Sequence, residues 1–345
     1  MSPLTASLAT LGTGRGLSML ESRSAFGSLL DGDASEIITA AFLTALRLKG
    51  ETADELEGAV AAVRERMTRW ESGTDVASLL DTCGTGGDGA GTVNISTAAA
   101  IVVAACGVPV VKHGNRAATS LSGSSDVLSV LGVSTNLGPA LSRRCLAELG
   151  IAFLFAPTFH PGLVRLAPVR RQLPFRTIFN LVGPLCNPGS PSQQLVGVPN
   201  ENQAELVAQV LSRQEHIHRA VVVTGCDGLD EVTLDGPTQV WAVEAGRVRR
   251  EVWHPEDFGL IRQGVAAIKV RNPLESAEKL TRAFTGEKGP VRDYILANSA
   301  AALWIARSNS LQDGTALAAA AIDSGAAAGL LERWRRLAPS DTVES

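Results

Sequence analysis

Residues 81–97 join a glycine-rich loop to the start of a helix-like run, with the sequence DTCGTGGDGAGTVNIST. Glycine has no Cβ, so such a loop lets a ligand approach the main chain closely. Exposed amides in the loop and at a helix N-terminus bind anions, and Asn94, Ser96 and Thr97 add side-chain donors there. The segment therefore predicts a site for phosphate or diphosphate, although its spacing matches neither the P-loop nor the dinucleotide-binding motif. A flexible structural loop is the alternative interpretation.

A second polar segment follows an apolar run at residues 110–126, VVKHGNRAATSLSGSSD. Lys112, His113, Asn115 and Arg116 end the apolar run, and hydroxyl residues follow them. Cationic and hydroxyl side chains beside glycine suit a further part of a phosphate site. Taken singly, Lys112 reads as a solvated lysine at a strand end and His113 as a structural hydrogen-bonding residue. Their grouping behind one strand favours a functional role.

Acidic residues follow another apolar run in VVVTGCDGLDEVTL, where Asp230 and Glu231 are adjacent. Carboxylates at a strand end suit Mg²⁺, which takes one or two of them together with substrate phosphates and water. An acidic, solvated turn is the alternative. The stretch 155–189 adds His160 and several arginines, which either meet an anionic substrate or form a solvated basic helix face. No G-x-S-x-G elbow surrounds the serines near 122–125, so covalent catalysis is not expected.

The composition excludes several classes of protein. The chain has 345 residues, 45% of them hydrophobic, and a net charge of -4, whereas nucleic-acid-binding domains are usually strongly basic. Its five cysteines contain no C-x-x-C pair, which argues against a disulfide framework or a zinc site. The most apolar run, residues 98–111, is shorter than the ~20 residues of a membrane span and reads as a buried helix and strand. We expect a cytoplasmic protein without nucleic-acid or membrane partners.

The elements expected to position these residues form two parts. Residues 1–75 read as a small all-helical domain, in which Thr52 and Glu55 form a capping box and Gly50 ends a helix. Residues 76–345 alternate apolar runs with helical patterns, which predicts an α/β domain with a central, mostly parallel sheet. Strands are expected at 108–114, 151–157, 219–225 and 239–246, and helices in the tail. Ligands of such sheets bind beyond the carboxyl ends of the strands, where the polar segments lie.

Four segments, taken in order, resemble the signatures of the anthranilate phosphoribosyltransferase family: GTGGDGAGTVNIST, KHGNRAATSLSGSSDVL, FHPGLVRLAPVRRQL with RTIFNLVGPLCNP, and DGLDEVTL. The likeness extends to the N-terminal helices and the tail. It implies transfer of the phosphoribosyl group from 5-phosphoribosyl diphosphate to anthranilate, with release of diphosphate, as the second step of tryptophan biosynthesis from chorismate. It also implies two Mg²⁺ ions beside the bound donor.

The resemblance assigns roles to individual residues. Lys112 is expected to stabilise the leaving group, with no side chain acting as acid or base. Metal ligands are expected to be Ser96, Asp230 and Glu231. Anthranilate is expected to contact Gly84, His113, Asn115, His160 and Arg170. The diphosphate donor is expected to contact Gly84, Gly87, Asp88, Thr92, Asn94, Ile95, Ser96, Thr97, Lys112, His113, Gly114, Asn115, Arg116, Ala117, Ala118, Thr119, Ser120 and Ser124.

The resemblance also implies a fold and an assembly. The active site is expected in the cleft between the two domains, with residues 165–186 packing back onto the helical domain, through which the chain forms a homodimer. Four residues differ from those that the resemblance leads us to expect, namely Gly91, Leu121, Leu163 and Pro174. Two alternatives therefore stay open: a phosphoribosyltransferase of the same fold with another aromatic acceptor, and a relative that binds without turnover.

Overall fold

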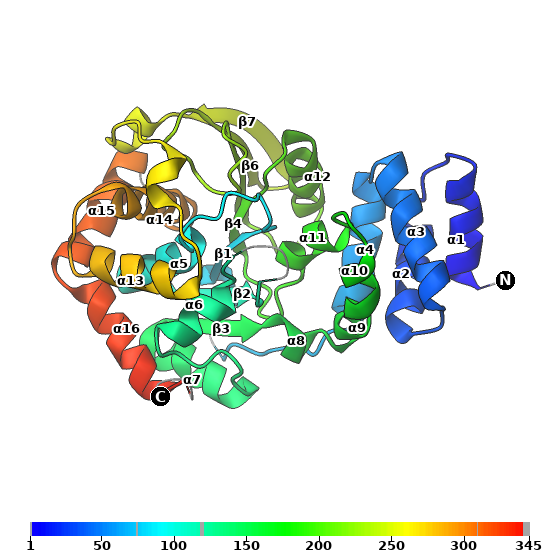
Figure 1. Ribbon diagram of the computed structural model, residues 1–345, viewed down its shortest axis with the longest axis horizontal. Helices are drawn as coiled ribbons and strands as arrows, with labels where there is room; N and C mark the ends of the chain where they lie inside the picture. The colour runs from blue at the N-terminus through cyan, green and yellow to red at the C-terminus, as the bar shows by residue number, and fades with distance from the viewer. Residues whose placement is uncertain (1, 74, 118–120, 309, 341–345) are drawn as a thin grey trace.

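The structure is a computed structural model, which describes residues 2–73, 75–117, 121–308 and 310–340. A bundle of N-terminal helices lies beside a larger α/β part, and the two are arranged along the long axis of the molecule (Figure 1). Within the described residues, no single helix has both the length and the hydropathy needed to cross a membrane. Among the described helices, only α15 (Leu311–Asp323) and α16 (Ala326–Leu337) reach these together, with a bend of 61° between them.

Four helices form the N-terminal bundle: α1 (Pro3–Gly12), α2 (Met19–Asp31), α3 (Glu36–Lys49) and α4 (Ala53–Arg66). The expected capping box is present, since the Thr52 side chain accepts from the Glu55 amide while the Glu55 carboxylate accepts from the Thr52 amide. Gly50 follows α3 with a φ of 88°, a conformation that favours glycine. Local capping signals therefore set these helix ends.

Seven strands form one sheet in the order β3-β2-β1-β4-β5-β6-β7, parallel from β3 to β5 and antiparallel from β5 to β7. This agrees with the expected α/β class with a mostly parallel sheet. The strands are β1 (Leu80–Gly84), β2 (Val110–Gly114), β3 (Ile151–Phe155), β4 (Gln193–Gly197), β5 (Arg219–Gly225), β6 (Thr238–Glu244) and β7 (Arg247–Trp253). The four strands expected from sequence are present. A further strand expected at 76–80, before the glycine-rich loop, instead begins at Leu80 as β1 and follows the 3-10 helix η1 (Val76–Ser78), whereas β4 and β7 were not expected.

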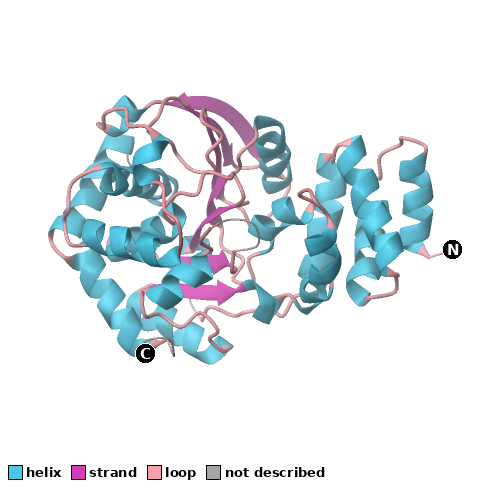
Figure 2. Ribbon diagram, in the orientation of Figure 1, coloured by secondary structure: helices cyan, strands magenta, loops and turns pink. Residues whose placement is uncertain are grey.

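Helices cover both faces of the sheet (Figure 2). Side chains alternate between two hydrophobic clusters, as in β5, where Val221 and Val223 join one cluster and Ala220 and Val222 join the other. The first cluster contains α5 (Ile95–Ala105), α6 (Ser124–Val130), α7 (Pro139–Leu149), α13 (Pro273–Phe284), α14 (Pro290–Arg307), α15 (Leu311–Asp323) and α16 (Ala326–Leu337). The second contains α12 (Glu201–Ser212) and is continuous with the core of the N-terminal bundle.

A run of short elements connects β3 to β4 and reaches back to the bundle. It comprises α8 (Ala156–Phe159), α9 (Pro161–Arg165), α10 (Ala167–Gln172), α11 (Phe179–Val182) and the 3-10 helix η2 (Gly183–Cys186). Helix α9 contacts α2, and α10 contacts α3. The Arg165 guanidinium donates to the backbone carbonyls of Leu30, at 3.2 Å, and Asp31, at 2.7 Å, at the end of α2. The bounds of the two domains, 1–75 and 76–345, stay a prediction.

Candidate active site

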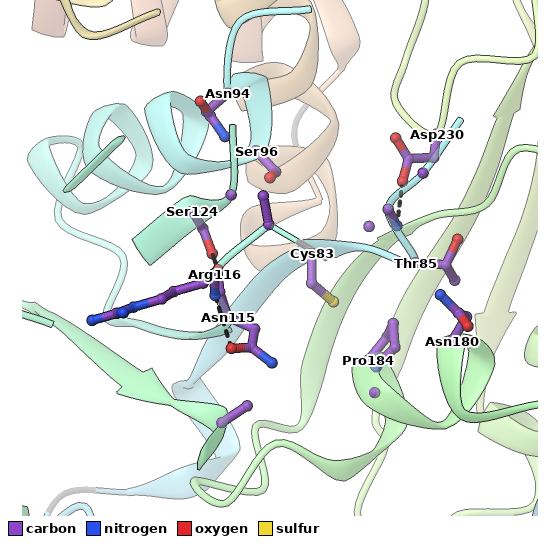
Figure 3. A pocket seen from close by; sticks show the side chains of 18 of the residues that line it. Cys83, Thr85, Asn94, Ser96, Asn115, Arg116, Ser124, Asn180, Pro184 and Asp230 are labelled. Atoms are coloured by element: carbon purple, nitrogen blue, oxygen red, sulfur yellow. Dashed lines mark hydrogen bonds between the residues drawn. The ribbon is translucent and has the colours of Figure 1, made fainter. Parts of the chain in front are cut away.

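A cavity of about 320 Å³ lies at the carboxyl ends of β1 and β2. Its walls come from the loop after β1, the loop after β2, the turn after β5 and the 156–186 segment. Figure 3 shows Asn94 and Ser96 on one side of the cavity and Asp230 on another, with Asn180 and Pro184 below Asp230. Segments far apart in the sequence therefore meet at one edge of the sheet, as ligand sites of parallel sheets do.

The glycine-rich loop is shaped partly by the protein and partly for a ligand. A Cβ on Gly84 would lie 2.5 Å from Oδ2 of Asp230, so glycine at this position makes room for a carboxylate of the protein itself. Gly87 has a φ of 63°, in the left-handed region that other residues rarely adopt. The Gly86 amide donates to Asp230 at 2.7 Å, which fixes the loop against the acidic turn.

Lys112 projects from β2 under this loop and is only 2% exposed. Its ammonium donates to the backbone carbonyl of Thr82 and, at 3.2 Å, to the hydroxyl of Ser96. Burial raises the pKa of the nearby Asp81 and Glu231 carboxyls, to about 6 and about 7, and the positive charge of Lys112 opposes both shifts. A buried cation held in this way is ready to interact with a further anion in the cavity.

Two adjacent acidic residues line the cavity after β5: Glu231 contacts the start of α5, and Asp230 contacts the glycine-rich loop at Gly86. Burial, followed by the negative charge of Asp88, raises the pKa of Asp230 well above its usual value. Burial also raises the pKa of Glu231, to about 7, although the Glu231 carboxylate accepts from the Ser96 amide at 3.0 Å. A cation bound at this wall would reduce the repulsion between the two carboxyls and favour their ionised forms.

These oxygen donors fit magnesium in a particular way. Within the part of the chain that the structure describes, no three His, Cys, Asp or Glu side chains lie close enough to hold a metal ion by themselves. Mg²⁺ is usually held by one or two carboxylates, with substrate phosphates and water completing its shell. Asp230, Glu231 and the Ser96 hydroxyl match that pattern, so the residues fit Mg²⁺ bound together with a phosphate ligand.

The opposite wall of the cavity carries two neutral imidazoles and an arginine. The rings of His113 and His160 lie 5.1 Å apart. Burial lowers the pKa of His113 well below its usual value and lowers that of His160 to about 4. Arg170 lies over the ring of Phe179 at 5.3 Å, and burial lowers its pKa. An aromatic, anionic ligand would find both a ring and a cation on this wall.

Buried polar atoms in this region still have unused hydrogen-bonding capacity. Among the described residues, Nε2 of His113 and the hydroxyl of Thr85 have no hydrogen-bond partner, and neither ring nitrogen of His160 makes a bond of normal geometry. Buried polar atoms are usually paired, so unpaired ones that cluster at a cavity point to a ligand. The wall with the imidazoles is thus suited to a ligand with its own polar groups.

Nearly all the residues expected at the site line this one cavity. The exceptions are Thr97, whose side chain is buried away from it, and Ala118, Thr119 and Ser120, which lie outside the described residues. The roles of the individual residues stay predictions. The residues that do line it are Gly84, Gly87, Asp88, Thr92, Asn94, Ile95, Ser96, Lys112, His113, Gly114, Asn115, Arg116, Ala117, Ser124, His160, Arg170, Asp230 and Glu231.

The cavity also contains residues that sequence reasoning did not assign. Phe179, Asn180 and Pro184 lie in the quoted segment RTIFNLVGP, which was the available signal, but no residue of that segment received a role. Leu163 and Leu121, two of the residues that differ from expectation, line the cavity as well. Gly91 lines it too, beside Leu121, whereas Pro174 does not. Three of the four departures therefore lie at the site, and of these three only Leu163 shares the 156–186 segment with His160 and Arg170.

Comparisons with known proteins agree with this architecture. Residues 6–67 match the helical bundle domain of the glycosyl transferase family, and residues 76–328 match its a/b domain. Anthranilate phosphoribosyltransferase from Methylobacterium radiotolerans is 46% identical over 330 residues, which cover 95% of this chain and 94% of the relative. The enzyme of that name from Symbiobacterium thermophilum is 45% identical over 343 residues, covering 99% of this chain and 100% of the relative.

Solved structures of anthranilate phosphoribosyltransferases are also similar to this chain. The crystal structure of anthranilate phosphoribosyltransferase from Thermus thermophilus superimposes with a TM-score of 0.89 at 37% identity, covering 98% of this chain and 99% of that one. The Saccharomyces cerevisiae enzyme in complex with PRPP and Mg gives a TM-score of 0.88 at 28% identity, with 97% of each chain covered. A complex of the yeast enzyme with 4-fluoroanthranilate gives 0.86 at 26% identity, again with 97% of each chain covered.

The helical bundle, the seven-stranded sheet and the cavity between their segments thus define a glycosyltransferase. Within that class, the extent and level of identity place the chain in the anthranilate phosphoribosyltransferase family.

Proposed function

We propose that this chain transfers the phosphoribosyl group of 5-phosphoribosyl diphosphate to anthranilate, giving N-(5-phosphoribosyl)anthranilate and diphosphate. One observation carries the proposal: an anion-binding loop, a pair of carboxylates suited to Mg²⁺, and a wall with an aromatic ring and an arginine share one cavity. These are the three chemical environments that the donor, the metal and the acceptor require. The related Saccharomyces cerevisiae enzyme has been solved in one complex with PRPP and Mg and in another with 4-fluoroanthranilate.

Donor binding is assigned to the loops that follow β1 and β2. The backbone amides of the glycine-rich loop and of the first turn of α5 would meet the diphosphate, as helix N-termini and glycine loops do in other phosphate sites. Lys112 reaches the same space from below and adds a fixed positive charge. Asn115, Arg116 and Ser124, from the second loop, complete the donor side.

Two Mg²⁺ ions are proposed beside the donor, held by Asp230, Glu231 and Ser96 together with phosphate oxygens. When bound, Mg²⁺ supplies positive charge that stabilises the departing diphosphate. Asp230 and Glu231 have to be deprotonated for this role, and Lys112 favours the ionised form of Glu231. Ser96 contributes its hydroxyl, which is already within 3.2 Å of the Lys112 ammonium.

Catalysis is attributed to charge stabilisation and alignment. The amine of anthranilate is a neutral nucleophile, so the main barrier is cleavage of the bond between C1 of ribose and the diphosphate oxygen. Lys112 and the loop amides stabilise the negative charge that develops on the leaving group. Arg170 pairs with the acceptor carboxylate, and Phe179 and the imidazoles of His113 and His160 hold its ring behind C1. Such alignment contributes up to ~7–11 kcal/mol in well-oriented systems.

A homodimer through the helical bundle is part of the same proposal. Two large apolar side chains of α3, Ile37 and Leu48, are 79% and 82% exposed. They are eleven residues apart, which is close to three helical turns, so both lie on the same face of α3. Exposed apolar residues on one face are expected to be covered by a partner, here the same face of a second copy.

The experiment that tests the proposed function is product analysis by mass spectrometry. The protein is incubated with 5-phosphoribosyl diphosphate, Mg²⁺ and one aromatic acceptor at a time, and diphosphate is measured in parallel. We expect phosphoribosylanthranilate and diphosphate in equal amounts. Diphosphate release with only another aromatic amine or acid would contradict the acceptor while keeping the donor. Donor binding without release in any mixture would indicate a relative that binds without turnover.

A further inference from the structure

The N-terminus of α5, which faces the cavity, has an unusual cap. Asn94 stands at the N-cap position, yet its side chain makes no capping hydrogen bond to the helix. Asparagine is among the most favourable N-cap residues, because its side-chain oxygen normally accepts from the amides of the first turn. Another interaction must therefore hold the Asn94 side chain away from the helix.

Two serines hold it. Oδ1 of Asn94 accepts from the hydroxyl of Ser122, at 2.7 Å, and from the hydroxyl of Ser276, at 2.8 Å. Nδ2 of Asn94 donates to the Ser122 carbonyl at 3.0 Å, and the Asn94 amide donates to the Ser276 hydroxyl at 3.1 Å. Only this orientation of the amide gives the Ser122 carbonyl a donor, so the network itself fixes which atom is the oxygen.

The three residues of this network, Asn94, Ser122 and Ser276, connect the two donor loops with the C-terminal part of the chain. Asn94 ends the glycine-rich loop, Ser122 ends the loop after β2, and Ser276 comes from α13. Ser276 is 0% exposed, and it lies 182 residues from Asn94 along the chain. The carbonyl oxygen of Asn94 is saturated, since a side-chain oxygen offers two lone pairs and both are used.

The start of α5 does not depend on the Asn94 side chain for a cap, because other groups accept from its first two amides. The Ile95 amide donates to the Val93 carbonyl at 2.8 Å, and the Ser96 amide donates to the Glu231 carboxylate at 3.0 Å. Asn94, Ile95 and Ser96 all line the cavity in which the donor is proposed to bind.

We propose that Ser276 is a positioning residue for the donor. With Ser122, it holds the Asn94 side chain between the two donor loops, so that Asn94, Ile95 and Ser96 keep their positions at the cavity in which the donor is proposed to bind. This inference rests on the proposed function for the identity of the donor. It assigns a role to a residue of α13 that touches neither substrate, and it joins both donor loops through one side chain.

The test compares Ser276→Ala with wild type in two measurements: the Kd of the Mg²⁺ complex of 5-phosphoribosyl diphosphate by calorimetry, and the KM values of both substrates. Loss of one neutral hydrogen-bonding group typically changes affinity about fivefold, and we expect that increase in the donor Kd and KM. The KM for anthranilate should stay unchanged. Ser276→Thr, which keeps the hydroxyl, should restore the wild-type donor values.

The matched control is Ser299→Ala on α14. Ser299 is also 0% exposed, but its hydroxyl has no hydrogen-bond partner among the described residues, so its removal should change neither substrate constant. If Ser276→Ala does not fold, Ser122→Ala tests the same network from the loop side, where the same donor-selective loss is expected.

Two results would overturn the inference: an unchanged donor Kd in folded Ser276→Ala or Ser122→Ala, or equal losses for both substrates. The proposed function fails separately, since a wild type that binds the donor without transferring it to anthranilate would contradict the function alone. In that case the comparison of donor Kd values still decides the role of Ser276.

Discussion

Individual side chains of the cavity divide into a donor group and an acceptor group. Lys112, Asp230 and Glu231 are buried or partly buried ionisable groups beside the glycine-rich loop, and burial raises the pKa of both carboxyls. Arg170 and His160 lie on the wall formed by residues 156–186. Substitutions in the two groups should therefore affect different substrates, which can be measured separately.

Arg170→Ala should impair use of anthranilate. Loss of a charge-assisted hydrogen bond to the acceptor carboxylate is expected to raise the KM for anthranilate at least tenfold, with little change in the KM for the donor. Steady-state kinetics with each substrate varied in turn measure this. Arg171→Ala, the exposed neighbour on the same helix, is the control and should behave as wild type. Equal losses for both substrates in Arg170→Ala would contradict the assigned role.

Glu231→Gln should change the pH dependence of stability. Without metal, the folded protein holds the Glu231 proton up to about pH 7, whereas the unfolded chain releases it near pH 4.5. The wild type should thus lose stability as pH rises between these values, and Glu231→Gln should lose less, since it lacks this carboxyl while Asp81 and Asp230 keep raised pKa values. Urea unfolding of both proteins at pH 5, 6, 7 and 8 without Mg²⁺ should show a widening advantage for the variant. A constant difference across this range would contradict the raised pKa.

At the scale of elements, the sequence predicted what local patterns determine. Capping at Thr52 and the apolar runs of β2, β3, β5 and β6 gave correct helices and strands, because these signals act over a few residues. Strand β7 was missed because most of its residues are exposed and charged, as an edge strand requires, so it has no apolar run. Strand β4 was missed because it begins with two glutamines, which leaves only a short apolar sequence after them, although both glutamines are accommodated in the sheet.

In the site, too, features set by local sequence were predictable and features set by long-range contacts were not. The donor loops were predictable because each signature is contiguous in sequence. The Asn94–Ser122–Ser276 network was not, because its hydrogen bonds join residues 28 and 182 positions apart. Local patterns also could not explain why residue 84 is a glycine, since the atom that a Cβ there would meet belongs to the distant Asp230. Long-range contacts that only the folded chain creates therefore limit prediction from a single sequence.

Two helix glycines test the packing of elements. A Cβ on Gly58 in α4 would lie 2.4 Å from the Met19 carbonyl oxygen and 2.6 Å from Cβ of Ser22, both at the α2 interface. Gly58→Ala is expected to destabilise the protein by about 1–3 kcal/mol through overpacking. A Cβ on Gly329 in α16 would meet only the end of the Arg333 side chain, at 3.8 Å. Gly329→Ala should therefore raise the free energy of unfolding by about 0.5–1 kcal/mol, because alanine has the higher helix propensity. Denaturant unfolding measures both, and a stabilised Gly58→Ala protein would contradict the close contact of α2 and α4.

The whole molecule is proposed to be a homodimer in which the helical bundle of each copy covers the other. Ile37→Glu with Leu48→Glu places charge on the exposed face of α3, which should convert a particle of twice the 36.0 kDa chain mass into monomers. Sedimentation equilibrium measures the mass directly. Ile261→Glu, at a 75% exposed residue of the α/β part, is the control and should leave the mass unchanged. A wild-type monomer, or a dimer that survives the double substitution, would contradict this interface.

The central claim is that this one cavity joins 5-phosphoribosyl diphosphate to anthranilate with the help of Mg²⁺. The most direct test is the fluorescence of anthranilate, followed after adding the donor with and without Mg²⁺. We predict a loss of signal that requires the protein, the donor and Mg²⁺ together, and that disappears in the Asp230→Asn, Glu231→Gln double variant. Unchanged fluorescence with wild-type protein and all components present would contradict the account.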